Sequence, residues 1–160
     1  MAISPNTTFV SGAIFTATQA NQFPRGIMGF ASSTSNYTLT TTMTATTGMS
    51  VTFTAVANRY YKITYYEPIA ETTTVSGGQT NLKIFQTSTA GTQLTSTVLQ
   101  NSAALKVLGG VSAIAIISNF TAGSKTVIGA GSTTSTTGTP ILQRNLFFPS
   151  FLLVEDMGPA

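Results

Sequence analysis

The acidic side chains are the first candidates for chemistry, because the chain has only four of them and no His or Cys. They fall in two pairs, Glu67 with Glu71 and Glu155 with Asp156. Two carboxylates at a set separation can hydrolyse a glycosidic bond, so a carbohydrate-active enzyme is a distant alternative for the function. A helix would bring Glu67 and Glu71 together, but Pro68 and the Thr residues after Glu71 argue against one. We expect Glu155 and Asp156 to end a strand in water rather than to bind a cation.

The rest of the usual catalytic equipment is missing. Without Cys and His, the chain has no disulfide, no thiolate nucleophile and no side chain with an ordinary pKa near neutrality. We therefore predict no catalytic residue, no cofactor and no metal site. Exposed charges contribute under about 1 kcal/mol each to stability, so replacing all four acids should destabilise the protein little.

Charge and hydropathy also narrow the choice of partners. Charged residues make up 7% of the chain, the net charge is +3, and the seven bases are scattered rather than clustered. Phosphate binding needs clustered bases, so we expect no nucleic-acid partner. The most apolar stretch, 103–117, is interrupted by Lys106 and two Gly residues, so we expect no membrane insertion. The first residues lack the pattern of a secretory leader, which predicts synthesis in a cytoplasm.

Most of the chain has the pattern of β-strands. Runs rich in Thr, Val, Ile, Tyr and Phe, bounded by Gly, Asn and Pro, predict strands at 27–32, 37–44, 50–56, 60–67, 81–87, 94–100, 111–120, 125–130 and 148–155. Many short strands with almost no helix predict an all-β fold, an antiparallel β-sandwich of the jelly-roll kind.

Several pairings and positions follow from the turns between these runs. We expect hairpins between 50–56 and 60–67, around Asn58, and between 81–87 and 94–100, around Gly91. The run 111–120 is the most apolar, which predicts a central strand returning through Gly123 as 125–130. The stretch 131–140 is almost pure Ser, Thr and Gly and is interpreted as a loop. The apolar run before Glu155 predicts a last strand buried on both faces.

The first residues differ from the rest, and we divide the chain into an N-terminal segment, 1–25, and a β-sandwich domain, 26–160. Thr16 and Gln19 have the spacing of a capping box, which predicts a helical turn over 17–22; a plain loop is the alternative. The segment is too apolar to be a tail exposed to water, so we predict that it anchors the protein to a partner. The predicted anchoring residues are Phe9, Phe15, Phe23, Pro24 and Arg25.

The sandwich surface is expected to be rich in Thr and poor in charge, which makes it easy to desolvate. We therefore expect a symmetric homo-oligomer. Tyr60 and Tyr66 should lie on the outer face of their strand and are candidate contacts for a glycan or another subunit. Tyr61 and Tyr65 alternate with them and are expected in the core.

Several segments resemble one family. The opening SGAIFTATQAN at 11–21 and FPRGIMG at 23–29 resemble the G-x-x-L-T-A-A-x-x-N … L-P-R-G opening of small β-rich virion proteins of tailed bacteriophages. TFTAVANRY at 52–60 and FLLVEDMGP at 151–159 resemble the central hairpin and the closing strand of that family. The chain departs from the pattern at Phe15, Thr18 and Asn58, where Leu, Ala and Gly are usual.

The resemblance implies a structural protein of the phage particle, a homotrimer whose partners are other virion proteins, and it carries no catalytic residues. Such proteins are often labelled minor tail or tail-fibre proteins, which favours a tail location and a host-surface glycan as a further partner. The short chain without a fibrous shaft favours capsid decoration. The two locations remain alternatives here.

Overall fold

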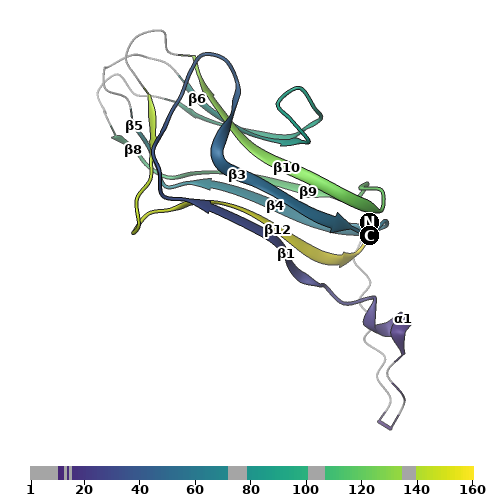
Figure 1. Cartoon of the computed structure of the whole chain (residues 1–160). Coiled ribbons are helices and arrows are strands. Elements are labelled where there is room, and N and C mark those ends of the chain that lie inside the picture. The colour runs from purple at the N-terminus through teal and green to yellow at the C-terminus, as the bar shows by residue number, and fades with distance from the viewer. Residues whose placement is uncertain (1–10, 13, 15, 72–78, 101–106, 135–139) are drawn as a thin grey trace.

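The computed structural model describes residues 11–12, 14, 16–71, 79–100, 107–134 and 140–160. Two four-stranded antiparallel sheets are packed face to face in an elongated sandwich, and a short helix projects from one end (Figure 1). The expectation of an all-β antiparallel sandwich is confirmed. Residues 111–116 alternate buried and exposed side chains, and residues 59–67 alternate buried and half-buried ones, which is the pattern that a sheet with one face on a core requires.

The first sheet, called sheet A here, contains β1 (Gly26–Ser33), β12 (Ser150–Pro159), β4 (Arg59–Glu67) and β9 (Val111–Ile117), in that spatial order. The second, sheet C, contains β3 (Thr44–Ala55), β10 (Gly123–Thr133), β6 (Gln79–Gln86) and β7 (Gln93–Gln100). Counted along the chain, the eight long strands are ordered 1-8-3-6 and 2-7-4-5. This interleaving of two Greek keys is the jelly-roll arrangement.

A third small sheet caps one end of the sandwich. It contains β2 (Tyr37–Thr38), β11 (Ile141–Gln143), β5 (Ile69–Glu71) and β8 (Val107–Leu108). Each of these strands lies in a connection between two long strands, so four connections at the same end pair with one another. Figure 1 shows β5 and β8 at the end of the molecule opposite to α1 (Ala17–Ala20).

The core lies between sheets A and C. Tyr61, Ile63 and Tyr65 of β4 are fully buried, as are Leu82 and Ile84 of β6. The prediction that Tyr61 and Tyr65 are core residues is therefore confirmed. At one end of the core Phe53, Tyr61 and Phe120 pack with ring centroids 5.4–5.9 Å apart.

Two predicted pairings are wrong. Residues 50–56 and 60–67 do not form a hairpin, because β3 pairs with β10 in sheet C while β4 pairs with β12 and β9 in sheet A. The turn at Asn58 does occur, with φ 59°, but it carries the chain from one sheet to the other. The return from 111–120 to 125–130 also crosses between the sheets, and β9 is an edge strand rather than a central one. The hairpin of β6 and β7 is confirmed.

The boundaries of other predicted elements also differ. The run 37–44 is broken, with two residues in β2 and only Thr44 in β3, because its middle turns between two sheets. The strand β10 continues to Thr133, so the predicted loop at 131–140 begins too early; 135–139 lie outside the described residues. The last strand is a central one: Leu152 and Val154 are fully buried, while Phe151 and Leu153 on its other face are half-buried.

The predicted helical turn is present but shorter than expected, over Ala17–Ala20. The Thr16 hydroxyl accepts from the Gln19 amide at 3.2 Å, and the Gln19 side chain accepts from the Thr16 amide at 2.9 Å. This reciprocal pair is the capping box expected from the sequence. Among the residues that the structure describes, no helix is long and apolar enough to cross a membrane.

Candidate interaction site

A buried ion pair attaches the N-terminal segment to the sandwich. Arg59, the first residue of β4, donates from Nε to the Asp156 carboxylate at 2.6 Å and from Nη2 to its second oxygen at 2.8 Å. The same guanidinium donates to the backbone carbonyls of Asn21 at 2.5 Å and Phe23 at 2.6 Å. A guanidinium suits this arrangement because its planar donors can serve a carboxylate on one edge and carbonyls on the other.

A bulge in β12 places Asp156 for this contact. The register between β12 and β4 shifts between Asp156 and Gly158, and Gly158 adopts φ 110°, a conformation that Gly reaches without strain. The Gly158 amide donates to the Asp156 carboxylate at 2.8 Å. The carboxylate therefore accepts from both the guanidinium and its own strand.

The predicted anchoring residues differ in their surroundings. Phe9 and Phe15 lie outside the described residues. Phe23 is 38% exposed, Pro24 lies over Gly158, and Arg25 is exposed with Nη2 3.5 Å from the Asn21 side-chain oxygen. The sequence analysis did not identify Arg59 and Asp156, which hold this segment. The only signal in the sequence was the presence of both in segments that carry the family resemblance.

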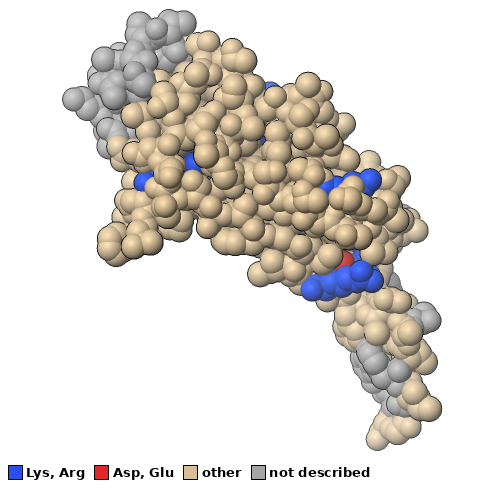
Figure 2. All heavy atoms as spheres, viewed as in Figure 1, with Lys and Arg blue, Asp and Glu red and all other residues tan. Residues whose placement is uncertain are grey.

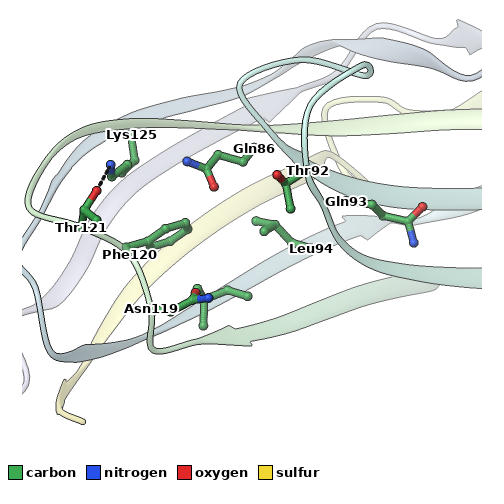
Figure 3. A pocket seen from close by; sticks show the side chains of 9 residues that line it. Gln86, Thr92, Gln93, Leu94, Asn119, Phe120, Thr121 and Lys125 are labelled. Atoms are coloured by element: carbon green, nitrogen blue, oxygen red, sulfur yellow. Dashed lines mark hydrogen bonds between the residues drawn. The ribbon is translucent and has the colours of Figure 1, made fainter.

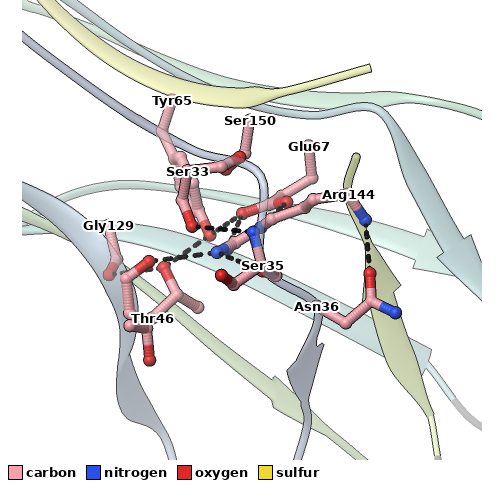
Figure 4. A network of polar contacts seen from close by, with 10 residues as sticks. Ser33, Ser35, Asn36, Thr46, Tyr65, Glu67, Gly129, Arg144 and Ser150 are labelled. Atoms are coloured by element: carbon pink, nitrogen blue, oxygen red, sulfur yellow. Dashed lines mark hydrogen bonds and ion pairs between the residues drawn. The ribbon is translucent and has the colours of Figure 1, made fainter. Parts of the chain in front are cut away.

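A second buried network closes the opposite end of the sandwich (Figure 4). Arg144 donates from Nε to Glu67 at 2.9 Å and from Nη2 to the other Glu67 oxygen at 2.5 Å, and both side chains are fully buried. Its Nη1 donates to the Thr47 carbonyl at 3.0 Å, and its backbone amide donates to the Asn36 side chain at 2.8 Å. Four separate segments are thus joined at one arginine.

Tyr65 adds a phenol to this network. Its hydroxyl donates to Glu67 and lies 2.8 Å from the Thr46 hydroxyl. Burial, and then the nearby Glu67 charge, raise the pKa of the Tyr65 phenol well above its usual value. Burial opposes the charged form of Arg144, but the hydrogen bonds and charge of Glu67 outweigh it and raise the pKa of the guanidinium.

These two networks overturn the prediction that all four acids are surface charges. Glu67 is fully buried and Asp156 is 1% exposed, each held by a guanidinium. Glu155 fits the expectation, since its ion pair with Lys62, 3.3 Å long, is partly exposed. The side chain of Glu71 lies outside the described part of the structure. Replacing all four acids would therefore destabilise the fold strongly. In the described residues no group of three or more Asp, Glu, His or Cys side chains is close enough to hold a metal ion.

The outer face of sheet A is largely apolar. Ile27 and Phe30 of β1 are 67% and 60% exposed, and Ile114 and Ile116 of β9 are 51% and 65% exposed. Tyr60 and Tyr66 both lie on this face and are half-buried. The Tyr66 and Phe151 rings are 5.2 Å apart, and Phe30 stacks on Phe151 at 6.2 Å. On the face that Figure 2 shows, Lys and Arg atoms appear in only a few separate places.

A second apolar surface is the connection between β11 and β12. Leu146, Phe147 and Phe148 are 80%, 84% and 56% exposed. The Asn145 side chain accepts from the amides of Phe147 at 2.8 Å and Phe148 at 2.9 Å, so the tip has a defined shape. Exposed apolar groups gathered in this way are typical of contact sites.

A polar hollow of about 450 Å³ lies where the ends of β7 and β10 meet the β9–β10 connection (Figure 3). Its floor is apolar, from Leu94, Ile117 and Phe120. Its rim has amides, hydroxyls and one ammonium, which belong to Gln86, Thr92, Gln93, Asn119, Thr121 and Lys125. The Lys125 ammonium donates to the Thr121 hydroxyl at 2.7 Å. The sequence analysis missed this hollow, because its lining comes from β6, β7, β9, β10 and the connection between β9 and β10.

Comparisons with known proteins place the chain in no family. No protein-family model and no curated protein matches the sequence. The chain is similar in structure to Eiger TNF from S. frugiperda, at 10% identity and a TM-score of 0.46, covering 85% of this chain and 96% of that one.

Two further solved structures are similar. One is the CBM22-1 xylan-binding domain of Paenibacillus barcinonensis Xyn10C, at 12% identity and a TM-score of 0.35, covering 82% of this chain and 88% of that one. The other is a chain of infectious bursal disease virus Gx strain, at 12% identity and a TM-score of 0.25, covering 86% of this chain and 41% of that one. Likenesses this low carry no argument about function.

Proposed function

We propose that the protein is a non-enzymatic structural subunit on the outer surface of a tailed-phage virion, held to the particle by its N-terminal segment. The observation that carries this proposal is the attachment of that segment by Arg59, which donates to the carbonyls of Asn21 and Phe23 while it is paired with Asp156. Because the segment is bonded to the sandwich in this way, a partner that binds the segment also holds the sandwich.

The position of the segment supports the same function. Figure 1 shows α1 projecting from one end of the sandwich, away from both sheets. A particle bound through this end would leave the sandwich and its far end facing outward. The resemblance of the opening and closing segments to phage virion proteins supports a virion location.

The state of the acids supports a structural rather than an enzymatic role. Glu67 and Asp156 are buried and each is bound to an arginine, so neither is poised for acid–base catalysis on a bound substrate. The parent protein should release no reducing sugar from host polysaccharide. Measurable release would favour a depolymerase.

Deletion of residues 1–22 tests the anchoring role. The truncated protein keeps the whole sandwich, so we expect an unchanged β-type circular dichroism spectrum and a cooperative unfolding transition. We expect it to be absent from purified particles assembled in its presence, while the full-length protein is incorporated. A folded but truncated protein that is incorporated normally would contradict the anchoring role.

Imaging of labelled particles tests the location. With a gold or fluorescent label on the C-terminus, we expect label spread over the shell in many copies. Label confined to the tail tip or fibres would support the alternative, a minor tail or tail-fibre protein. Absence of the protein from purified particles would contradict both locations.

The polar hollow is the observation that favours this alternative. An apolar floor with neutral amides and hydroxyls at the rim suits the ring face and hydroxyl groups of a sugar. The Tyr60 and Tyr66 pair on sheet A is the competing site. If the hollow binds a host-surface glycan, Asn119→Ala and Gln93→Ala should each weaken binding about tenfold, while Tyr66→Ala should not. The reverse result would place the glycan on sheet A.

A further inference from the structure

The outer face of sheet A contains three complete rows of side chains, each running across all four strands in the order β1, β12, β4, β9, and Tyr60 lies beyond the first row. The backbone register defines the rows. The first row is Ile27, Glu155, Lys62 and Ile116. The second is Phe30, Leu153, Thr64 and Ile114. The third is Ser32, Phe151, Tyr66 and Ser112.

When each row is read from its two ends, five of the six pairs of positions are alike in chemistry or opposite in charge, and the exception is Leu153 with Thr64. The outer positions of the three rows are Ile with Ile, Phe with Ile, and Ser with Ser. The inner positions are acid with base, Leu with Thr, and Phe with Tyr. The match at the inner positions includes the only charges in the rows, Glu155 and Lys62, which lie 3.3 Å apart within one chain.

This pattern is what a two-fold axis parallel to the strands requires. Such an axis, placed between two stacked sheets, keeps each row at the same level along the strands and reverses the order of the strands. Each row of one copy therefore faces the same row of the second copy in the opposite order. Ile27 then faces Ile116 of the second copy, Phe30 faces Ile114, and Glu155 faces Lys62. Phe151 faces Tyr66 in the same way. Apolar groups therefore meet apolar groups except where Leu153 faces Thr64, and every charge meets its opposite.

We propose that two copies of this chain associate face to face through the outer faces of their A sheets, about a two-fold axis parallel to the strands. Stacked sheets pack about 10 Å apart with strands near parallel, so the arrangement repeats the packing of the sandwich itself. The occupant is a second copy because the face is complementary to its own reverse. It carries no net charge that would select an acidic or basic partner.

The size of the face sets the expected strength. Four strands about 4.8 Å apart, each contributing about seven residues at 3.4 Å, make a face of roughly 450 Å² in plan. Projecting side chains increase the accessible area, but the contact remains at the small end of specific interfaces, which bury about 800 Å² per partner. We therefore expect a reversible dimer with a dissociation constant on the order of micromolar.

Charge reversal across the interface tests the proposal. In a dimer of the variant Lys62→Glu, an acid faces an acid at each of the two places where positions 62 and 155 of different copies meet. In a dimer of Glu155→Lys, a base faces a base at the same two places. Each variant alone should sediment as a monomer at concentrations where the parent is a dimer. When the two variants are mixed, the new acid at position 62 of one faces the new base at position 155 of the other. The two unchanged side chains, an acid and a base, also face each other, so a heterodimer should form, which native mass spectrometry identifies by its mass.

The mixing experiment distinguishes this proposal from one in which Lys62 and Glu155 interact only within one chain. An ion pair within one chain cannot be restored by a second molecule. Lys83→Glu makes the same charge change on β6 in sheet C, so it should still dimerise by itself and should not rescue Glu155→Lys. A heterodimer of that control mixture would attribute the rescue to overall charge and overturn the proposal.

A second, matched pair of variants tests the apolar part of the face. Ile114 on sheet A and Val98 on sheet C are both 51% exposed on edge strands. Ile114→Lys should raise the dissociation constant at least tenfold, while Val98→Lys should leave it unchanged. A parent protein that is monomeric over a hundredfold concentration range would overturn the proposal. So would the trimer expected from the family resemblance, if Ile114→Lys left that trimer intact.

Discussion

The guanidinium of Arg144 and the carboxylate of Glu67 form a two-pronged ion pair, with N–O distances of 2.5 and 2.9 Å and no exposure to solvent. The two residues lie 77 positions apart in the chain, on β4 and just after β11. Removing both charges from water is unfavourable, and only the close contact and the additional hydrogen bonds offset it. Removing one partner of this pair is therefore expected to destabilise the fold more than removing both.

We predict that Glu67→Gln lowers the free energy of unfolding by about 3–5 kcal/mol, because it leaves the Arg144 charge buried without its partner. Urea denaturation followed by circular dichroism measures the change. The double variant Glu67→Gln with Arg144→Met is the control, since it removes the buried charge as well. It should be clearly more stable than the single variant, and equal stability of the two would contradict the assignment.

The Arg59 attachment predicts a local effect at the N-terminal segment. Lys at position 59 keeps the charge for Asp156 but lacks the separate donors that reach the Asn21 and Phe23 carbonyls. If those contacts contribute about 2 kcal/mol, trypsin cleavage after the exposed Arg25 should be about thirtyfold faster in Arg59→Lys. Cleavage after Lys125 within the sandwich should not change. Equal acceleration at both sites would indicate general unfolding instead.

The raised pKa of Tyr65 predicts a loss of stability in alkali. The unfolded chain releases this proton near the ordinary value of 10.0, whereas burial and the Glu67 charge keep the folded phenol neutral. The unfolded state then binds fewer protons, so stability from this group is fully present below pH 10.0 and falls as the pH rises above it. The slope approaches about 1.4 kcal/mol per pH unit.

The matched variant Tyr65→Phe isolates this effect. It loses the hydrogen bonds to Glu67 and Thr46 at every pH, so it should be less stable at pH 7. The gap between the parent and the variant should narrow above pH 10. A gap that stays constant up to pH 12 would contradict the role of Tyr65.

Contact between the two main sheets at Gly29 predicts a steric effect. A Cβ atom at this position would lie 2.3 Å from Cγ1 of Val51, which is buried on β3. We expect Gly29→Ala to lower the free energy of unfolding by about 1–3 kcal/mol. Adding Val51→Ala removes the clash, so the double variant should be more stable than the sum of the single effects by about 1 kcal/mol. Additive effects would contradict this packing.

Local sequence patterns identified most of the strands and, along β4, the face that each side chain takes. Alternation along β4 placed Tyr61 and Tyr65 inside and Tyr60 and Tyr66 outside, because side chains in a strand alternate with period two. The capping box of Thr16 and Gln19 and the turn at Asn58 were also readable, since both depend on neighbouring residues only. The class of fold follows from the number and spacing of these strands.

The pairing of strands depends on tertiary contacts that local sequence patterns do not reveal. The period of a strand shows its faces but not its partner, so the chain crosses between sheets at Asn58 where a hairpin was expected. For the same reason Glu67 and Asp156 could not be recognised as buried, because their arginine partners lie 77 and 97 residues away. The matching rows of sheet A likewise exist only in the register of four strands, which local propensities do not encode.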